Sequence, residues 1–216
     1  MSIKINYPKG SANKSPKNQV LFTNEKLKIE NLKNFLTKTE FSYVSELLKA
    51  GDPKKNLHIF ELNSKKKIVL ILIKDNLKIS DIENLGAELF GKLNHGKDSE
   101  YDLISDSINS KFENFLGYLL HGLKLKSYEF KKYKTKKDNR LISINVVGRK
   151  NRPSIQSQLK FKALEEGTFY ARDLVSEPGN ILHPDEYAKR LSSLRNHGLK
   201  VTIYDEKKLK KLGMNA

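Results

Sequence analysis

The chain has 216 residues, with 41 Lys+Arg against 25 Asp+Glu, so its formal net charge is +16. This length suits one large domain or two modest ones, and a hydrophobic content of 38% argues against wholesale disorder. The chain contains no Cys, which excludes disulfides, thiolate metal sites and a cysteine nucleophile and fits a reducing compartment. Its amino terminus lacks the apolar core of a signal peptide, and its longest apolar run, residues 68–73, is far shorter than the ~20 residues of a membrane helix. We therefore expect a soluble, cytoplasmic protein without a membrane partner.

The positive charge comes mainly from lysine, since only six of the 41 basic residues are Arg. Such a lysine excess indicates a solvated surface before it indicates a binding function. Residues 121–160 are the most basic stretch, with twelve basic residues against two acidic ones. If any part of the chain binds nucleic acid, we expect it to be the segment that contains Lys131, Lys132, Lys134, Lys136 and Lys137.

The first 150 residues alternate strand-like and helix-like patterns. Alternating Ile3, Ile5 and Tyr7, then residues 20–22, predict two short strands, and residues 31–49 predict a helix. Residues 57–62 and 68–73 predict two further strands, which could form a hairpin across the polar turn at 63–66.

The same alternation continues to residue 147. Ser80 and Glu83 have the spacing of a capping box, and the helix they open places Ile82, Leu85, Leu89 and Leu93 on one face until Gly96. A strand at 101–104, a helix with apolar positions at Phe112, Phe115, Leu116, Leu119 and Leu123, and a strand at 141–147 follow. The pattern predicts an α/β domain over residues 1–150, with a mixed sheet flanked by helices.

A domain boundary is expected at residues 148–153, after which a long helix carries an apolar stripe of Phe161, Leu164, Thr168, Ala171 and Val175. Pro184 begins the next helix, with Tyr187, Leu191 and Leu194 on its buried face. Residues 199–203 alternate as a strand, and Asp205 caps a last helix with Leu209 and Leu212 facing inward. One strand between two helices has no neighbour to pair with, so we expect the second domain to be incomplete and the chain to be truncated.

Residue spacing alone shows no active site. The five histidines, at positions 58, 95, 121, 183 and 197, are isolated, and His183 is placed to be a helix N-cap. Nucleophile-elbow and phosphate-loop motifs are absent. The adjacent carboxylates Glu165/Glu166 and Asp205/Glu206 diverge by ~100° on a helix, so we expect them to be solvated or to interact with helix dipoles.

One long segment changes this interpretation. Residues 165–184, EEGTFYARDLVSEPGNILHP, resemble the junction between the amino-terminal and catalytic domains of leucyl (cytosol) aminopeptidases. Residues 117–137 resemble the last helix of the family's amino-terminal domain and the turn after it, and residues 201–214 resemble the first strand and helix of its catalytic domain. His183 stands where the family usually has Thr, and Asn215 where a small Gly is common.

The resemblance implies a macro-domain-like amino-terminal domain at 1–150, a linker helix and junction loop at 151–180, and the start of a catalytic domain at 181–216. For the complete protein it implies a homo-hexamer that hydrolyses peptides with two divalent metals, manganese or zinc. The family's catalytic and metal-binding residues lie downstream of residue 216, so no catalytic, cofactor-binding or metal-binding residue is assigned here and the chain itself is expected to be inactive. Arg172, Asp173, Glu177 and Asn180 belong to the junction motif and are interpreted as structural.

A second hypothesis is a basic DNA-binding module, because some members of the family also bind DNA through the amino-terminal domain. Phosphate-driven binding would weaken steeply with salt. An ADP-ribose site is a further idea from the macro-like fold, but no Gly-rich phosphate loop supports it.

Overall fold

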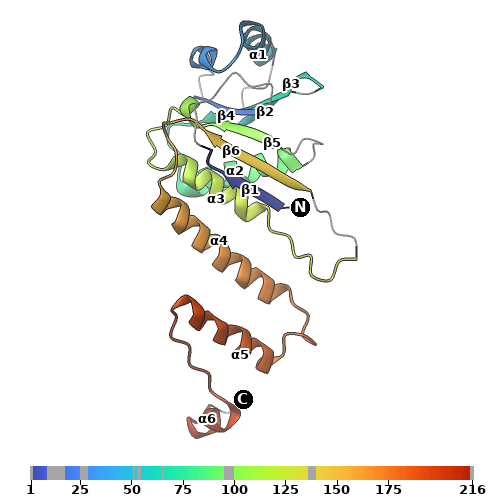
Figure 1. Ribbon diagram of the computed structural model, residues 1–216, viewed down its shortest axis with the longest axis vertical. Coiled ribbons are helices and arrows are strands. Elements are labelled where there is room, and N and C mark those ends of the chain that lie inside the picture. The colour runs from blue at the N-terminus through green and yellow to red at the C-terminus, as the bar shows by residue number, and fades with distance from the viewer. Residues whose placement is uncertain are drawn as a thin grey trace. The chain divides into compact units, whose positions relative to one another are not determined.

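The computed structural model describes residues 2–8, 18–24, 29–50, 52, 55–64, 66–94, 100–135 and 140–214 (Figure 1). The chain divides into two compact units, Met1–Gly167 and Thr168–Ala216. His95, Gly96, Lys136, Lys137 and Asn215, which the sequence analysis singled out, lie outside the described residues.

The first unit is built on a six-stranded sheet with the order β1-β6-β5-β2-β4-β3. Every neighbouring pair is parallel except the β3–β4 hairpin, which is antiparallel. The mixed sheet and the hairpin are therefore confirmed. The strands are β1 (Ser2–Asn6), β2 (Asn18–Asn24), β3 (Leu57–Asn63), β4 (Lys66–Ile73), β5 (Glu100–Ile104) and β6 (Leu141–Val147).

Helices flank this sheet on both faces, with α1 on one face and α2 and α3 on the other (Figure 1). The α-helices are α1 (Lys38–Ala50), α2 (Ile79–Asn94), α3 (Phe115–Lys126), α4 (Ile155–Ser176), α5 (Pro184–Ser192) and α6 (Glu206–Lys211). Short 3-10 helices are η1 (Glu30–Asn34), η2 (Ser105–Ser107) and η3 (Ser193–His197).

Two helix starts differ from the prediction. The helix expected at 31–49 is two helices, because Thr37 and Glu40 form a capping box in which each side chain accepts the other's backbone N–H. The box predicted at Ser80 is wrong: Ser80 already lies inside α2, and it is the Asp81 carboxylate that accepts the N–H of Lys78 at 2.8 Å.

The core consists of two clusters, one on each face of the sheet. Val20 and Phe22 of β2 pack with α2 and α3, while Leu21 between them packs with α1. Strand β4 is buried on both sides from Ile68 to Ile73, which explains why its sequence is a continuous apolar run rather than an alternating one.

Helices α2 and α3 approach each other through glycine. A Cβ atom on Gly86 of α2 would lie 1.9 Å from the carbonyl oxygen of Leu119, and one on Gly122 of α3 would lie 2.0 Å from that of Glu83. At these distances neither helix backbone could stay where it is. The two glycines therefore set the distance between α2 and α3.

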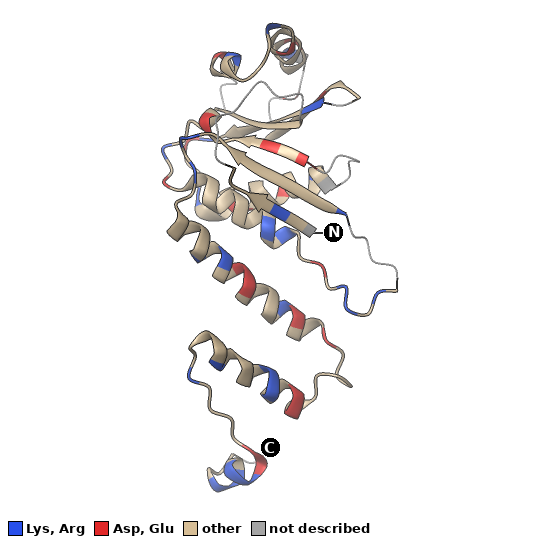
Figure 2. Cartoon of the chain, in the orientation of Figure 1, with Lys and Arg blue, Asp and Glu red and all other residues tan. Residues whose placement is uncertain are grey.

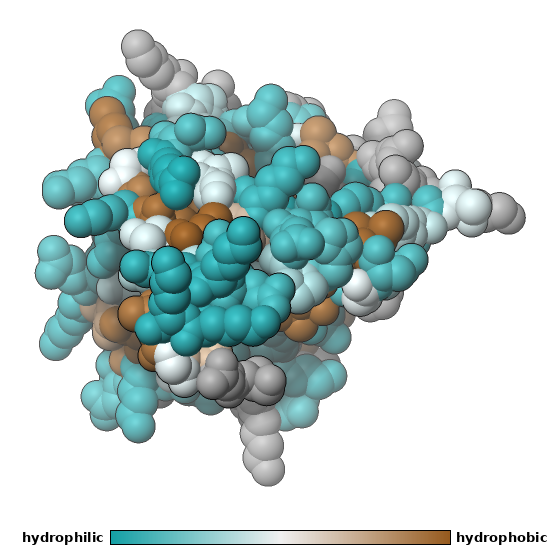
Figure 3. Space-filling view, turned by 90° about the horizontal axis from the view of Figure 1, so that it is seen from below, coloured by the Kyte–Doolittle hydropathy of each residue, from teal (hydrophilic) through white to brown (hydrophobic). Residues whose placement is uncertain are grey.

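The second unit differs most from the sequence prediction. Residues 199–203 form no strand, because no strand among the described residues 168–214 offers them an edge. Neither α5 nor α6 has a fully buried residue. Tyr187 and Leu212 are 44% and 51% exposed, so the inward-facing prediction is wrong for these two, whereas Leu191, Leu194 and Leu209 are half-buried. Figure 3 shows exposed hydrophobic side chains among hydrophilic ones, and Val175 of the predicted stripe is 87% exposed.

The glycine contact predicts opposite effects for two alanine substitutions within α2. Gly86→Ala must push the helices apart and should lower the free energy of unfolding by at least about 1 kcal/mol. Gly91 has no atom within 4 Å of the place where a Cβ would lie, so Gly91→Ala should raise that free energy by about 0.5–1 kcal/mol through helix propensity. Urea unfolding followed by circular dichroism measures both, and equal effects would contradict the close approach.

Candidate functional site

The four histidines that the structure describes belong to different elements. They lie on β3 (His58), on α3 (His121), before α5 (His183) and in η3 (His197). His183 is the N-cap of α5 by position, as predicted, although its side chain makes no capping hydrogen bond. In the part of the chain that the structure describes, no group of three or more His, Asp or Glu side chains could hold a metal ion.

The junction motif contains an ion-pair network within the second unit. Arg190 of α5 donates from Nη1 to Glu177 Oε1 and from Nε to Glu186 Oε1, both at 2.9 Å. The Glu177 side chain is only 2% exposed, so Arg190 compensates a carboxylate that has lost its water. The hydrogen bond from Arg190 also lowers the pKa of Glu186 below its ordinary value.

Sequence reasoning singled out Glu177 without finding its partner. The available signal was the i, i+4 spacing of Glu186 and Arg190, which is typical of a helix ion pair. Of the other motif residues, Arg172 and Asp173 lie on α4. Asn180 lies in a turn in which the N–H of Ile181 donates to the carbonyl of Pro178.

The beginning of α4 is attached to α3 by an aromatic and ionic contact. His121 Nδ1 lies 3.2 Å from Glu165 Oε1, with side-chain exposures of 9% and 14%. The Phe161 ring lies 4.9 Å from the His121 ring and 5.2 Å from that of Tyr118, between ring centroids. The expectation that Glu165 is solvated is thus wrong, because α4 turns this carboxylate toward α3 and leaves its neighbour Glu166 outside, 66% exposed.

Tyr7, just after β1, belongs to the same region. Burial raises the pKa of Tyr7 from 10.0 to about 12, the negative charge of Glu165 adds to this, and Arg152 opposes it. The Arg152 guanidinium lies 5.8 Å from the centre of the Tyr7 ring and donates to the carbonyls of Pro8 and Gly148. This cluster is ionisable and partly buried, but it is filled by its own side chains.

At the carboxyl ends of β5 and β6, a side chain of the protein likewise occupies the available hydrogen-bond donors. This edge of a parallel sheet is where ligands of α/β proteins usually bind. Here the Asp106 carboxylate accepts the N–H groups of Arg149 at 2.8 Å and of Lys150 at 2.6 Å. Gly148, at φ +131°, allows this turn, since a Cβ there would lie 2.4 Å from Ser105 Oγ. A carboxylate thus occupies the backbone donors that a phosphate would need.

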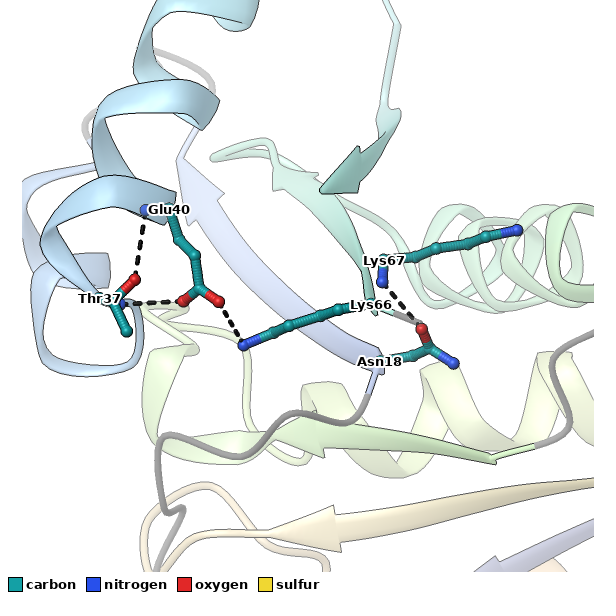
Figure 4. A network of polar contacts seen from close by, with 5 residues as sticks. All are labelled: Asn18, Thr37, Glu40, Lys66 and Lys67. Carbon is teal, nitrogen blue, oxygen red and sulfur yellow. Dashed lines mark hydrogen bonds and ion pairs between the residues drawn. The ribbon is translucent and has the colours of Figure 1, made fainter. Parts of the chain in front are cut away.

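At the opposite edge, polar side chains join the amino ends of three strands. Figure 4 shows the contacts of this network that involve β2, β4 and α1. Asn18 donates to the Glu100 carbonyl and accepts from the N–H of Lys67, so it links β2 to β5 and β4. The buried Lys66 ammonium donates to Glu40 at 2.8 Å. Burial alone would raise the pKa of Glu40, but hydrogen bonds from Lys66 and Thr37 lower it below its ordinary value. This network holds α1 to the sheet.

The basic segment considered for nucleic acid is partly neutralised. Glu129 lies 2.6 Å from Lys134 Nζ and 3.4 Å from Lys131 Nζ, and the hydrogen bond from Lys134 leads the effects that lower the pKa of Glu129 to about 2. Lys132 lies over the Tyr133 ring, 5.5 Å from its centre. Along the ribbons of α4 and α5, basic and acidic residues are interspersed (Figure 2). Nothing in the structure tests DNA binding directly, and it stays a prediction.

Comparison with known proteins gives one consistent result. A family model for the catalytic domain of the cytosol aminopeptidase family matches residues 169–216. A probable cytosol aminopeptidase of Bradyrhizobium sp. is 34% identical over 143 residues, which are 64% of this chain and 29% of the relative. One of Agrobacterium fabrum is 39% identical over 101 residues, 44% of this chain and 20% of the relative.

Solved structures share the fold. A tomato leucine aminopeptidase variant aligns with a TM-score of 0.70 at 18% identity, covering 99% of this chain and 46% of that one. A bottromycin maturation enzyme in complex with Mn aligns with a TM-score of 0.64 at 14% identity, covering 92% and 40%.

In sequence the chain is similar to cytosol aminopeptidases, and in fold to a leucine aminopeptidase. The chain is similar to proteins of the cytosol aminopeptidase family, which agrees with the resemblance of residues 165–184. The chain spans less than a third of the length of these two curated relatives, 29% and 20%.

The α3–α4 contact predicts that two adjacent glutamates differ in their effect on stability. Glu165→Ala leaves the buried His121 without its partner and should lower the free energy of unfolding by about 1–3 kcal/mol. Glu166→Ala removes only an exposed pair with Lys162 and should change it by less than about 0.5 kcal/mol. Urea unfolding of both variants, and a double-mutant cycle of Glu165→Ala with His121→Ala, measure this. A coupling energy near zero would disprove the contact.

The raised pKa of Tyr7 predicts a loss of stability at alkaline pH. The folded state favours the neutral phenol, so the contribution of Tyr7 is complete below pH 10 and is lost as the pH rises through about 12. We expect Tyr7→Phe to reduce the fall in unfolding free energy between pH 10 and pH 12. Tyr43→Phe, at a position 43% exposed on α1, is the control and should leave the fall unchanged. Equal curves for Tyr7→Phe and the unsubstituted chain would contradict the burial effect.

Proposed function

We propose that these 216 residues form the amino-terminal portion of a leucyl aminopeptidase, an exopeptidase that releases amino-terminal residues from peptides. The observation that carries the proposal is the match of residues 169–216 to the family's catalytic domain, directly after the first, sheet-containing unit. The likeness in fold to a leucine aminopeptidase supports it.

In the complete protein we propose two divalent metals, manganese or zinc, as cofactors. The related bottromycin maturation enzyme was solved in complex with Mn, which supports divalent metal use in proteins of this fold. The described residues of this chain do not fit such a centre, since they contain no metal-binding group of three His, Asp or Glu. The proposal therefore assigns no metal ligand and no catalytic residue within this chain.

The role proposed for this chain is structural. Residues 1–150 would form the amino-terminal domain, 151–180 the linker helix and junction loop, and 181–216 the start of the catalytic domain. The Glu177–Arg190 ion pair, 2.9 Å long, supports a structural role for the junction motif because it joins the segment after α4 to α5. A homo-hexamer in the cytoplasm is proposed for the complete protein from its family resemblance.

The test is hydrolysis of leucine p-nitroanilide with added Mn²⁺ or Zn²⁺. We expect no metal-stimulated activity from the purified 216-residue chain, and activity from the polypeptide encoded by the reading frame continued past residue 216. Circular dichroism of both proteins provides the control for folding. Activity of the 216-residue chain would show that the proposal is wrong to place the active site outside this chain. An inactive but folded longer protein would overturn the proposed function.

A further inference from the structure

A groove of about 610 Å³ lies in the first unit, at the carboxyl end of β4. One wall is α2, and the other is the loop that leads from β4 into α2. Its lining residues are Asn56, Leu72, Lys74, Asp75, Asn76, Leu77, Asp81, Asn84, Leu85 and Glu88. None of them belongs to the junction motif or to the network around Arg190, so the groove is independent of the proposed aminopeptidase function.

On the helical wall of the groove, the two carboxylates lie apart from each other along α2. Asp81, Asn84, Leu85 and Glu88 have i, i+3, i+4 and i+7 spacing, so they share one face of α2. Asp81 and Glu88 are seven residues apart, which corresponds to about 10 Å along the helix axis. Leu85 lies between the two carboxylates along α2, and Leu72 of β4 also lines the groove, with exposures of 7% and 4%. The groove therefore has carboxylates toward both ends and leucine in the middle.

Most polar side chains that line the groove make no hydrogen bond or ion pair with other described residues. Asp81 accepts the Lys78 N–H, but the carboxylates of Asp75 and Glu88 have no hydrogen-bond or ion-pair partner among the described residues. The same is true of three side-chain amides, those of Asn56, Asn76 and Asn84. Three carboxylates against the single Lys74 leave the groove negative, in a chain whose net charge is +16. Such local charge favours a cationic ligand.

We propose that this groove binds a linear aliphatic diamine or polyamine. One ammonium group interacts with Glu88 and another with Asp75 and Asp81, while the methylene chain between them packs on the leucines. The amide oxygens of the asparagines accept the remaining ammonium hydrogens. A metal ion would need ligands that converge within about 2.0–2.6 Å of one point, whereas a diamine carries two charges separated by an apolar chain, as the wall of α2 requires.

Isothermal titration of the 216-residue chain with spermidine tests the proposal, with hexylamine as the comparison ligand, which has an aliphatic chain but only one ammonium group where spermidine has three. We expect saturable 1:1 binding of spermidine and at least about tenfold weaker binding of hexylamine, since a charge-assisted hydrogen bond contributes about 1.5–3 kcal/mol. Glu88→Gln and Asp75→Asn should each weaken spermidine binding by about tenfold or more.

The matched control is Glu113→Gln, which removes the same charge at an exposed position outside the groove and should leave binding unchanged. Circular dichroism shows whether each variant is folded, and Asn84→Ala is a second groove variant should Glu88→Gln unfold. Absence of saturable spermidine binding would overturn the proposal. Equal affinity for hexylamine would overturn it as well, because the further ammonium groups would then contribute nothing. Equal weakening by Glu113→Gln would also overturn it, because binding would then reflect bulk charge alone.

Discussion

Helix α3 is packed so closely on two sides that the rest of the first unit depends on it. Gly122 brings its backbone against the carbonyl of Glu83 in α2, and Gly117 leaves the space into which the Phe161 ring of α4 fits. A Cβ at Gly117 would lie only 2.7 Å from that ring. Between these glycines, Leu119 and Leu120 are buried against the sheet. The glycines of this segment are therefore explained by close packing, because each faces a particular neighbour.

Periodicity in the sequence predicted the elements that bury their own apolar face against a neighbour. Strand β4 and the Ile82/Leu89 face of α2 are examples, since both are buried as expected. Prediction failed where the outcome depended on a contact distant in sequence. Glu165 looks like any exposed helical carboxylate until α4 lies against His121, 44 residues earlier in the chain. The same holds for the groove along α2, whose helical wall gains an opposite wall only when the β4 loop folds beside it.

Charge shows how composition and local structure can disagree. A net charge of +16 describes the whole chain, yet Glu129 pairs with two lysines of the most basic segment, and the groove beside α2 is negative. Interactions between exposed charges are screened beyond about 8–10 Å in physiological salt. A ligand near the surface therefore interacts with the few charges around it rather than with the net charge of the chain. Lysine content alone predicts neither the ion pairs of Glu129 nor the negative groove beside α2.

The second unit is consistent with the proposed function through what it leaves exposed. Leu199 and Ile203 alternate as in a strand but are 55% and 41% exposed, and no described strand of that unit pairs with them. Isolated strands are unstable because their backbone groups need a neighbouring edge. Leu199 and Ile203 lie within residues 169–216, which match the family model for the catalytic domain on which the proposed function rests. Alternation of apolar residues in a sequence therefore produces a strand only where a neighbouring strand supplies an edge, and the described residues 168–214 contain none.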